Sequence, residues 1–551
     1  MRNGLFFNVT CVSFLFSSMV FSADLAKGYL LCRDASTLFV NAKFITLNPS
    51  QPEATAVAVR HGRLVAVGEQ SQILAHCRGN ESQVIDLKGA FVVPGFIDTH
   101  SKFILYGWLS LQPGYEQPTT TTKQLLETLK NKLLNEEGWL IASNYNPVNV
   151  NDEALNKVLL DEHLKDKPCL VFYSSGNEVL LNQAAIEKLS SQDRAKDLKI
   201  NAQGLISGKD LKRLLSLLID KNKATLAIQE ASKYYTQQGY TTVTETMVNQ
   251  PWLAAYEHAA EQANSLDIIF NPDDASDKRL LEIIYQDNPR FYIGPLLMQI
   301  DGEVEDGAAF FTKPYLKSAV EPNAIWPGTL RVTKKELEDA LNNSAKENTS
   351  LALEVNGDAA LDLVLNAAIK TRGNAPDLLV FNAPLLRNDQ LQRLQQLGIK
   401  LSWYAPYIYL HSAELCNLLN NPGALFDNLS FSSAPHLLNG ISIQANSPST
   451  PPVPLQMLSL LQNSSLSGKA QSCLKPPKLQ LSPEALLGTL TINAAKAFNL
   501  QQDKGTLEVG KLADMAILNG NPLQQRGLQN LNVLGTISRG KLQWNQVPSV
   551  E

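Results

Sequence analysis

The chain has 551 residues, a net charge of −5 and 44% hydrophobic residues, which is the balance of a folded soluble protein. This composition excludes a disordered chain, a fibrous chain and a polytopic membrane protein, and the lack of a long basic run argues against nucleic-acid binding. Only seven histidines are present, which limits any histidine-rich metal site.

Residues 1–23 have the pattern of a secretory signal peptide. Arg2 is followed by an apolar stretch and by small residues near Ser22 and Ala23. An uncleaved anchor helix is the alternative interpretation. No later stretch reaches the ~18 apolar residues that a membrane-spanning helix needs. We therefore expect a secreted or periplasmic protein with no membrane span once the signal is removed.

Five cysteines remain after the expected cleavage: Cys32, Cys77, Cys169, Cys416 and Cys473. Export permits disulfides, and Cys32 and Cys77 flank the same predicted strand region, so these two are candidates to pair. The alternative is that all five are buried thiols. An odd number leaves at least one cysteine unpaired, and the lack of a CxxC pair argues against thiol redox chemistry and cysteine zinc sites.

Short runs of alternating apolar and polar residues predict strands near both ends of the chain. Near the N-terminus they are 37–47, 54–68 and 83–95, and His61-Gly62 marks a hairpin turn inside the second run. Near the C-terminus, residues 505–518 and 532–544 have the same pattern. We expect residues 36–95 and 500–545 to form one discontinuous β-sandwich domain.

Between these ends, predicted helices alternate with predicted strands, which indicates a parallel α/β architecture. About 400 residues of this pattern suit a (β/α)8 TIM-type barrel with insertions over residues 96–499. The expected helices are 122–138, 223–239, 334–349, 358–371 and 387–398, and the expected strands are 138–145, 169–175, 240–247, 291–300, 350–355, 376–383 and 399–406.

One phosphate-binding motif is set aside. Residues 505–511 read GTLEVGK, which matches GxxxxGK, but Leu512 stands where a Ser or Thr must reach magnesium. The segment also has the pattern of a strand pair, so a turn in a sheet is the better interpretation.

Several segments resemble a known family. PGFIDTH (94–100), TINAAKAFNL (491–500) and KGTLEVGKLADMAIL (504–518) resemble the metal-dependent amidohydrolase superfamily. GWLIASNYNP (138–147) and EVNGDAALDLVL (354–365), among others, resemble its type 3 branch, which includes N-substituted formamide deformylase-like proteins. The resemblance covers roughly residues 36–545. It implies one or two divalent metals such as zinc at the C-terminal mouth of the barrel, and hydrolysis of a non-peptide C–N bond.

The same resemblance implies a depleted metal site, because five of six metal or catalytic positions differ from the family pattern. Only His100 is kept. The substituted positions are Lys102 for the second histidine of HxH, Leu297 for the bridging lysine, Glu354 and Asn382 for two histidines, and Ser433 for the catalytic aspartate. Asn177 also replaces the histidine of a substrate-region SGH motif. We predict that these seven residues line the pocket, without a resident cofactor.

Three hypotheses follow for the function. The favoured one is a pseudoenzyme whose pocket binds a small ligand or whose surface binds a partner. The second is an active hydrolase of an amide-like bond with a single metal on His100 and Glu354, and with His436 as an optional third ligand. The third is a metal-free hydrolase that uses Lys102, Glu354 and Ser433. Lys102 and Glu354 either form an ion pair in the vacated site or each face solvent. The expected partners are a small-molecule ligand or substrate and, as often in this family, a second copy of the chain.

Overall fold

A computed structural model describes residues 32–547 apart from several internal ranges. These ranges are 114–120, 148–149, 151, 262–265, 305, 317–325, 372–376, 420–440, 444–451, 464–480 and 525–526. The expected signal peptide, Ser433, His436 and Cys473 therefore lie outside the described residues. Within the described part of the chain, no helix is long and apolar enough to cross a membrane.

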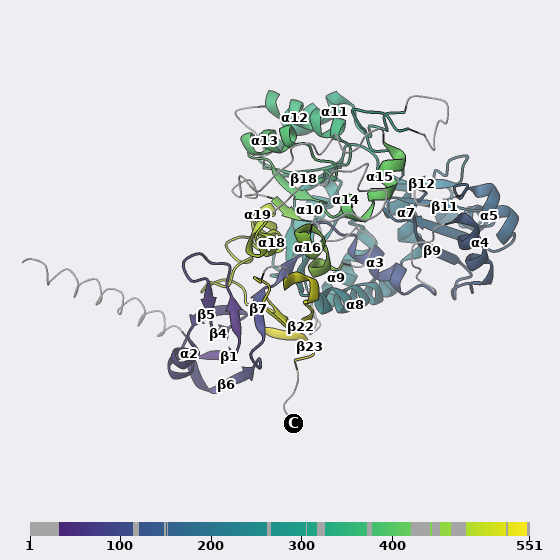
Figure 1. The fold of residues 1–551 in the computed structure, drawn as a ribbon. Coiled ribbons are helices and arrows are strands. Elements are labelled where there is room, and N and C mark those ends of the chain that lie inside the picture. The colour runs from purple at the N-terminus through teal and green to yellow at the C-terminus, as the bar shows by residue number, and fades with distance from the viewer. Residues whose placement is uncertain are drawn as a thin grey trace, which may run out of the picture.

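The centre of the molecule contains two parallel sheets with helices packed around them, so the expected parallel α/β architecture is confirmed (Figure 1). The first sheet has the order β15-β14-β13-β8 and the second has the order β16-β17-β18-β19-β20. Their strands are β8 (Phe96–Ile97), β13 (Tyr240–Glu245), β14 (Asp267–Phe270), β15 (Phe291–Ile293), β16 (Leu296–Gln299), β17 (Leu351–Val355), β18 (Leu378–Asn382), β19 (Lys400–Trp403) and β20 (Ile441–Ile443).

The two parallel sheets do not join into one continuous hydrogen-bonded barrel among the described residues, so the closed (β/α)8 barrel stays a prediction. One of the two breaks between the sheets lies within residues 291–300, where the sequence predicted a single strand. Gly294-Pro295 divides this run, because proline has no backbone N–H to donate to a ladder. As a result β15 pairs with β14, whereas β16 pairs with β17.

Helices follow most strands of the two parallel sheets, as the alternating pattern predicted. The helix expected over 334–349 begins after Thr333, which forms a capping box with Glu336. The helices of this region are α3 (Phe103–Ser110), α8 (Lys221–Gln237), α9 (Leu253–Ala260), α10 (Ala275–Tyr285), α11 (Lys334–Glu347), α12 (Asp358–Lys370), α13 (Asn388–Gln396), α14 (Tyr407–Leu410), α15 (Ser412–Leu418), α16 (Pro454–Asn463), α18 (Pro483–Leu490) and α19 (Ile492–Ala497).

An insertion between β8 and β13 forms a separate four-stranded sheet beside the central sheets (Figure 1, right). The strands expected over 138–145 and 169–175 belong to this sheet. Its order is β12-β11-β10-β9, with β9 (Leu140–Tyr145), β10 (Cys169–Tyr173), β11 (Glu178–Leu181) and β12 (Leu205–Ser207), and its helices are α4 (Thr122–Asn131), α5 (Lys157–Leu164), α6 (Gln183–Ser190) and α7 (Gly208–Leu218). Helix α4 ends earlier than the expected 122–138, because the Asn135 side chain accepts hydrogen bonds from the backbone of Glu137 and Trp139 and turns the chain into β9.

Strands from both ends of the chain share one sheet, as the sequence predicted. Its order is β23-β22-β21-β7-β2-β3, with β2 (Lys43–Ile45), β3 (Glu53–Ala54), β7 (Phe91–Pro94), β21 (Met515–Leu518), β22 (Val533–Ser538) and β23 (Lys541–Asn545). A second terminal sheet has the order β5-β4-β1-β6, with β1 (Ala35–Val40), β4 (Ala56–Arg60), β5 (Arg63–Gly68) and β6 (Arg78–Asp86). His61 and Gly62 both have positive φ between β4 and β5, which confirms the hairpin turn. The sandwich packing of the two sheets stays a prediction.

The cysteines follow the first of the two alternatives. Cys32 and Cys77 form a disulfide, and Cys77 is the last residue of the helix α2 (Gln70–Cys77). Cys416 is also disulfide-bonded, whereas Cys169 is a buried free thiol.

Candidate functional site

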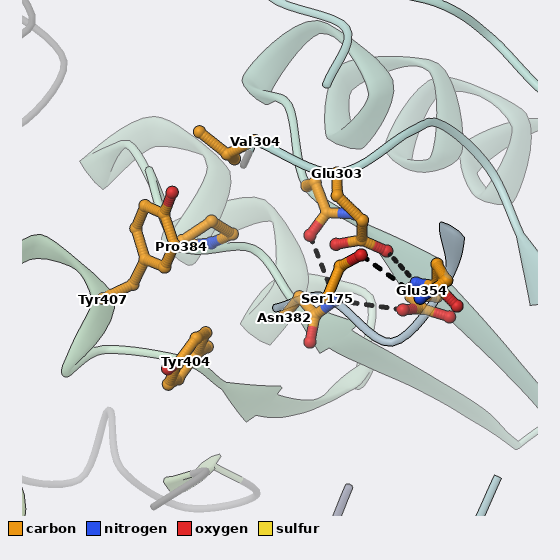
Figure 2. A pocket seen from close by; sticks show the side chains of 10 residues that line it. Ser175, Glu303, Val304, Glu354, Asn382, Pro384, Tyr404 and Tyr407 are labelled. Atoms are coloured by element: carbon orange, nitrogen blue, oxygen red, sulfur yellow. Dashed lines mark hydrogen bonds between the residues drawn. The ribbon is translucent and has the colours of Figure 1, made fainter. Parts of the chain in front are cut away.

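A pocket lies where the carboxyl ends of β17, β18 and β19 meet the loop that follows β16 (Figure 2). The hollow extends over about 330 Å³ when open solvent is included, but its free space for water-sized groups is only about 10 Å³. Six polar residues line it: Ser175, Asn177, Glu303, Glu354, Asn356 and Asn382. Four residues form its less polar part: Val304, Pro384, Tyr404 and Tyr407. Active sites of TIM-type barrels are found at this end of the strands, so the pocket is the candidate functional site.

His100 is buried behind the pocket, three residues after β8. Its ring packs on Phe381 with 4.8 Å between the centroids, and its Nε2 lies 3.8 Å from Glu354 Oε1. Neither ring nitrogen has a hydrogen-bond partner among the described residues. Burial lowers the pKa of His100 to about 4, because a charged imidazolium is unfavourable away from water. The side chain is therefore neutral at neutral pH.

Lys102 is held by neutral groups from the insertion. Its Nζ donates to the Ser175 carbonyl oxygen at 2.9 Å and to Asn177 Oδ1 at 2.6 Å. Asn177 Nδ2 in turn donates to Glu303 Oε1 at 2.6 Å, so the amide lies between the ammonium and this carboxylate. Burial lowers the pKa of Lys102 even though Glu354 and Glu303 oppose that shift. No ion pair joins Lys102 to Glu354 in the described part of the chain, and both side chains are buried, so neither of the two alternatives holds. The ammonium instead turns toward Ser175 and Asn177.

The position of Lys102 depends on the packing of α3, which begins directly after it. Helix α3 packs against α8, and a Cβ at Gly107 would lie 2.0 Å from the Ala227 carbonyl oxygen. Only glycine allows the two helix backbones to approach this closely. This contact fixes the chain that carries His100 and Lys102 beneath the pocket.

Glu354, on β17, begins a chain of amide hydrogen bonds. It accepts from Gln299 Nε2 at 3.1 Å and from Asn382 Nδ2 at 3.3 Å, and Asn382 Nδ2 also donates to Asn356 Oδ1 at 3.0 Å. Burial alone would raise the pKa of Glu354, but the neighbouring His100 and Lys102 hold it below its ordinary value. Since His100 is neutral, we attribute this shift mainly to Lys102. The ionised carboxylate orients Asn382, and Asn382 in turn orients Asn356.

The backbone at the end of β18 adopts an uncommon conformation. Asn382 and Ala383 have φ values of 70° and 40°, in the left-handed region that side chains with a Cβ rarely enter. Ala383 N donates to the Val355 carbonyl oxygen at 2.7 Å, which holds the turn in place. Strain of this kind persists where the surrounding structure imposes it, often at functional sites. Here it directs the Asn382 side chain toward Glu354.

Asp301 fixes the loop that carries Glu303. Its carboxylate accepts hydrogen bonds from the backbone N–H groups of Phe310, Asn356 and Gly357 at 2.7–2.8 Å. A Cβ at Gly357 would lie 1.9 Å from the Phe310 carbonyl oxygen, so only glycine permits this close approach. Burial raises the pKa of Asp301 to about 7. The loop is thereby tied to the end of β17.

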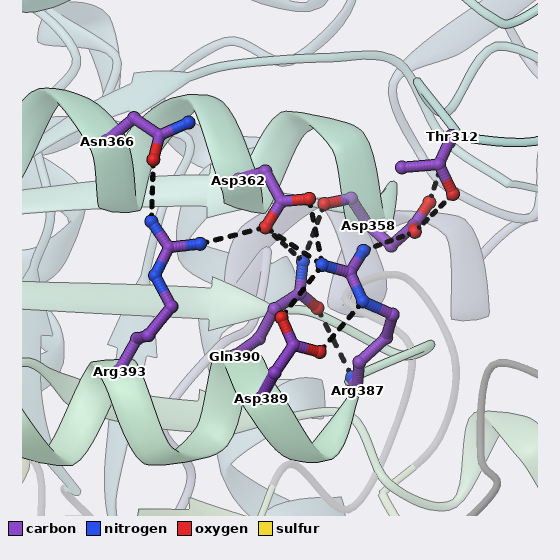
Figure 3. Close-up of polar contacts among 8 residues, drawn as sticks. All are labelled: Thr312, Asp358, Asp362, Asn366, Arg387, Asp389, Gln390 and Arg393. Carbon is purple, nitrogen blue, oxygen red and sulfur yellow. Dashed lines mark hydrogen bonds and ion pairs between the residues drawn. The ribbon is translucent and has the colours of Figure 1, made fainter.

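A cluster of ion pairs supports the same loop from the outer side (Figure 3). Arg387 binds Asp358, at the start of α12, as well as Asp362 and Asp389. Asp358 also accepts from the backbone N–H and the hydroxyl of Thr312 at 2.8 and 2.6 Å. These contacts join the segment after β18, the start of α12 and the loop after β16, and so fix the rim of the pocket.

The seven predicted pocket residues have different outcomes. Asn177, Glu354 and Asn382 line the pocket, whereas His100 and Lys102 lie behind it and contact its lining residues. Leu297 does not line the pocket: it packs in an apolar layer that includes Ile97, Ala352 and Leu379. Side chains on one face of a strand are two residues apart, so Gln299 reaches Glu354 while Leu297 lies deeper. Ser433 and His436 lie outside the described residues.

Sequence reasoning missed Glu303, Gln299, Asn356, Tyr404 and Tyr407. Each lies at or just after the carboxyl end of β16, β17 or β19. A search for polar and aromatic residues at strand ends would have found them, because side chains at these ends converge on one mouth.

The described residues alone do not provide the divalent metal site that the resemblance implies. Among them, no group of three or more His, Cys, Asp or Glu side chains is arranged to hold a metal. Catalytic zinc sites normally use three protein ligands, and here His100 and Glu354 supply two donors 3.8 Å apart. A protonated Lys102 donates hydrogen bonds and accepts none, so in that form it is not a ligand.

Comparisons with known proteins agree with this architecture. Two models of the amidohydrolase family match residues 83–425 and 454–542. The chain is 22% identical to an N-substituted formamide deformylase of Arthrobacter pascens, over 93% of this chain and 99% of that protein. It is 23% identical to the protein LONG AFTER FAR-RED 3 of Arabidopsis thaliana, over 92% of this chain and 91% of that protein.

A solved structure shows a similar fold. The crystal structure of an uncharacterised metal-dependent hydrolase from Pyrococcus horikoshii superimposes with a TM-score of 0.68 at 20% identity, covering 89% of this chain and 99% of that one. The fold is therefore the TIM-barrel-type, mixed α/β fold of amidohydrolases. The family match covers more than half of the sequence. The chain belongs to the amidohydrolase family.

Proposed function

We propose that this protein is an exported member of the amidohydrolase family that binds a small polar ligand in its pocket and has lost metal-dependent hydrolysis. The observation that carries the proposal is the position of Lys102, where the family pattern has a metal-binding histidine. Its Nζ is fixed by the Ser175 carbonyl oxygen and Asn177 Oδ1. A buried ammonium at this point would repel a divalent cation, and in a low-dielectric interior this repulsion is strong.

Three further expectations rest on separate observations. The Cys32–Cys77 disulfide supports a secreted or periplasmic protein, since disulfides persist in oxidising compartments. Contacts across both breaks between the two parallel sheets support their closure into a barrel. Across one break, Leu297 N donates to the Pro272 carbonyl oxygen at 2.7 Å; across the other, the Thr99 and Ser402 hydroxyls lie 2.6 Å apart. Shared packing of apolar residues from both terminal sheets likewise supports a sandwich.

The test is elemental analysis of protein purified without chelator, together with turnover of N-acyl and formamide substrates. We expect less than a stoichiometric amount of zinc, iron, manganese or nickel, and no turnover. The combined variant Lys102→His, Glu354→His, Asn382→His and Ser433→Asp should gain metal binding. Turnover by the unaltered protein would end the proposal, and chelator-resistant activity lost in Lys102→Ala would favour the metal-free hydrolase.

One observation favours a second candidate, a hydrolase with a single metal. His100 is neutral, both of its ring nitrogens lack hydrogen-bond partners within the described part of the chain, and the Glu354 carboxylate lies 3.8 Å away. Neutral imidazole and carboxylate are common metal ligands. One equivalent of metal in the unaltered protein, lost in His100→Gln and retained in the matched surface variant His163→Gln, would establish this candidate. We rank it second because Lys102 lies beside the same site.

A further inference from the structure

The pocket has two unlike sides, which together suggest the chemistry of its ligand. Figure 2 shows Glu303, Ser175, Asn382 and Glu354 on one side, and Val304, Pro384, Tyr404 and Tyr407 on the other. The rings of Tyr404 and Tyr407 lie edge to face, with centroids 5.6 Å apart. Carboxylates opposite aromatic faces are a favourable setting for an organic cation, because both attract positive charge.

The described charges around the pocket leave it negative. Among the groups that act most strongly on Lys102, three are carboxylates (Glu303, Glu354 and Asp306) and one is a cation (Arg331). The neutral Asn177 amide separates Lys102 from Glu303, which prevents a direct ion pair between them. Low-dielectric walls concentrate such a field, so an additional positive charge is favoured in the pocket.

A separate observation points to a hydrogen-bond acceptor on the ligand. Asn356 lines the pocket and is 4% exposed, and no described residue hydrogen-bonds to its Nδ2. Asn382 fixes the orientation of Asn356, because its Nδ2 donates both to Glu354 Oε1 and to Asn356 Oδ1. A buried donor without a partner is costly, and a ligand oxygen would remove this cost.

We propose that the pocket binds a small protonated amine that also carries a neutral oxygen acceptor and a short apolar group, as an amino amide does. The ammonium faces Glu303 and Glu354, the oxygen accepts from Asn356 Nδ2, and the apolar group lies against Tyr404 and Tyr407. The free space of the whole pocket is about that of one water molecule, which suits an ammonium group, and the rest of the ligand lies in the part that is open to solvent. This inference rests on the proposed function, in which the pocket binds a ligand without using a metal.

The test compares three matched probes by calorimetry or ligand-observed NMR at pH 6.5, where an α-amino group is protonated. Valinamide has the ammonium, the amide oxygen and the apolar group. The probe 3-methylbutanamide lacks the ammonium, and 2-methylpropylamine lacks the oxygen. We expect valinamide to bind at least about tenfold more tightly than either of the others, since each loses a hydrogen bond to a buried group. Equal or tighter binding of 3-methylbutanamide, or no binding of valinamide, would overturn the inference.

Variants separate the charge from the rest of the pocket. Glu303→Gln should weaken valinamide binding about tenfold and leave 3-methylbutanamide unchanged, because a charge-assisted bond is lost while the shape is kept. Tyr404→Leu should weaken both probes. Glu127→Gln, on the exposed face of α4, is the matched control and should change neither. Circular dichroism and the thermal midpoint verify folding, and Glu354→Gln replaces Glu303→Gln if the latter does not fold. An unchanged affinity of a folded Glu303→Gln or Glu354→Gln variant for valinamide would contradict the inference.

Failure of the inference and failure of the proposed function give different results. Ammonia release from valinamide, or stoichiometric metal, would overturn the loss of hydrolysis while leaving the preference for a cation intact. A preference for the uncharged probe in a metal-free, inactive protein would overturn the cation inference alone.

Discussion

Two buried charge clusters at opposite ends of the central strands are built on different principles. At the amino-terminal end of β14, Lys504 pairs with Asp267 and Asp514, and Asp267 also pairs with Arg290 and Arg539. Burial alone would lower the pKa of Lys504, but the two carboxylates raise it above its ordinary value.

At the pocket the buried groups have weaker partners. Burial lowers the pKa of Lys102, whose ammonium contacts only neutral acceptors among the described residues, and His100 has no hydrogen bond. The first cluster joins the C-terminal segment to the strands and contributes to stability. The second cluster contains polar groups to which a ligand can hydrogen-bond. Matched substitutions in the two clusters should therefore differ in size.

The largest effect is expected for Lys504→Met. Removal of this ammonium leaves the buried Asp514 carboxylate without its cation and takes one of three cations away from Asp267. The free energy of unfolding should therefore fall by about 3–5 kcal/mol. Urea denaturation measures the change. Lys400→Met is the control, because Lys400 pairs with the partly exposed Asp377 and should cost less than about 1 kcal/mol. Equal costs for the two variants would contradict the stabilising role of the Lys504 cluster.

The next effect concerns pH and His100. Its pKa is about 4 in the folded protein against an ordinary value of 6.5, so the unfolded chain takes up this proton first as the pH falls. Relative to His100→Gln, the unaltered protein should lose about 3 kcal/mol of stability between pH 6.5 and pH 4. Above pH 6.5 the difference should be constant.

The difference from His100→Gln is needed because other buried groups titrate over the same range. Burial raises the pKa values of Asp98, Glu245 and Asp301 to about 7, so they bind protons more tightly in the folded state and their contribution falls as the pH rises. Denaturation of both proteins at several pH values isolates His100. A difference that does not depend on pH would show that its pKa is unshifted.

A smaller effect is expected for Asn177→Leu. This change removes one of the two acceptors of Lys102 and the amide that donates to Glu303. We expect the free energy of unfolding to fall by about 2 kcal/mol. In the double variant Lys102→Met/Asn177→Leu part of this loss should be recovered, because the buried ammonium is gone. A double-mutant cycle by urea denaturation measures the coupling, and strictly additive losses would contradict it.

The smallest effect is expected for Lys102→Met. This ammonium is buried without a direct ion pair, so its replacement by an apolar side chain of similar length should change the unfolding free energy by less than about 1 kcal/mol, in either direction. Thermal and urea denaturation, side by side with Lys504→Met, show the contrast. A loss as large as that of Lys504→Met would mean that Lys102 has an essential structural role.

Much of the fold could be predicted from the sequence because local patterns carry it. The His61-Gly62 turn, the capping box before α11 and the strands shared by both ends of the chain were visible as short-range signals. The break at Gly294-Pro295 was also present in the sequence, yet the apolar run around it predicted one strand. Pattern alone does not say that β15 and β16 pair with different neighbours.

The candidate site was predicted less well. The resemblance placed Glu354, Asn382 and Asn177 at the pocket and Leu297 beside them, but the two-residue period of β16 puts Gln299 near Glu354 instead. An ion pair of Lys102 with Glu354 was one of two alternatives that charge left open. The contact with Asn177 depends on the insertion, which brings β10 and β11 to the end of β8.

The sequence by itself determined the family and the alternation of helices and strands, because each depends on residue identity or short-range periodicity. The loss of most metal-binding side chains stays a prediction from the resemblance. Tertiary structure decided which side chains meet. Lys102 and Asn177 are 75 residues apart and hydrogen-bond at 2.6 Å, and Glu354 and Asn382 come from separate strands. The shift in the pKa of His100 also arises only in the folded protein, since burial and neighbouring charge are properties of the packed chain and not of any segment.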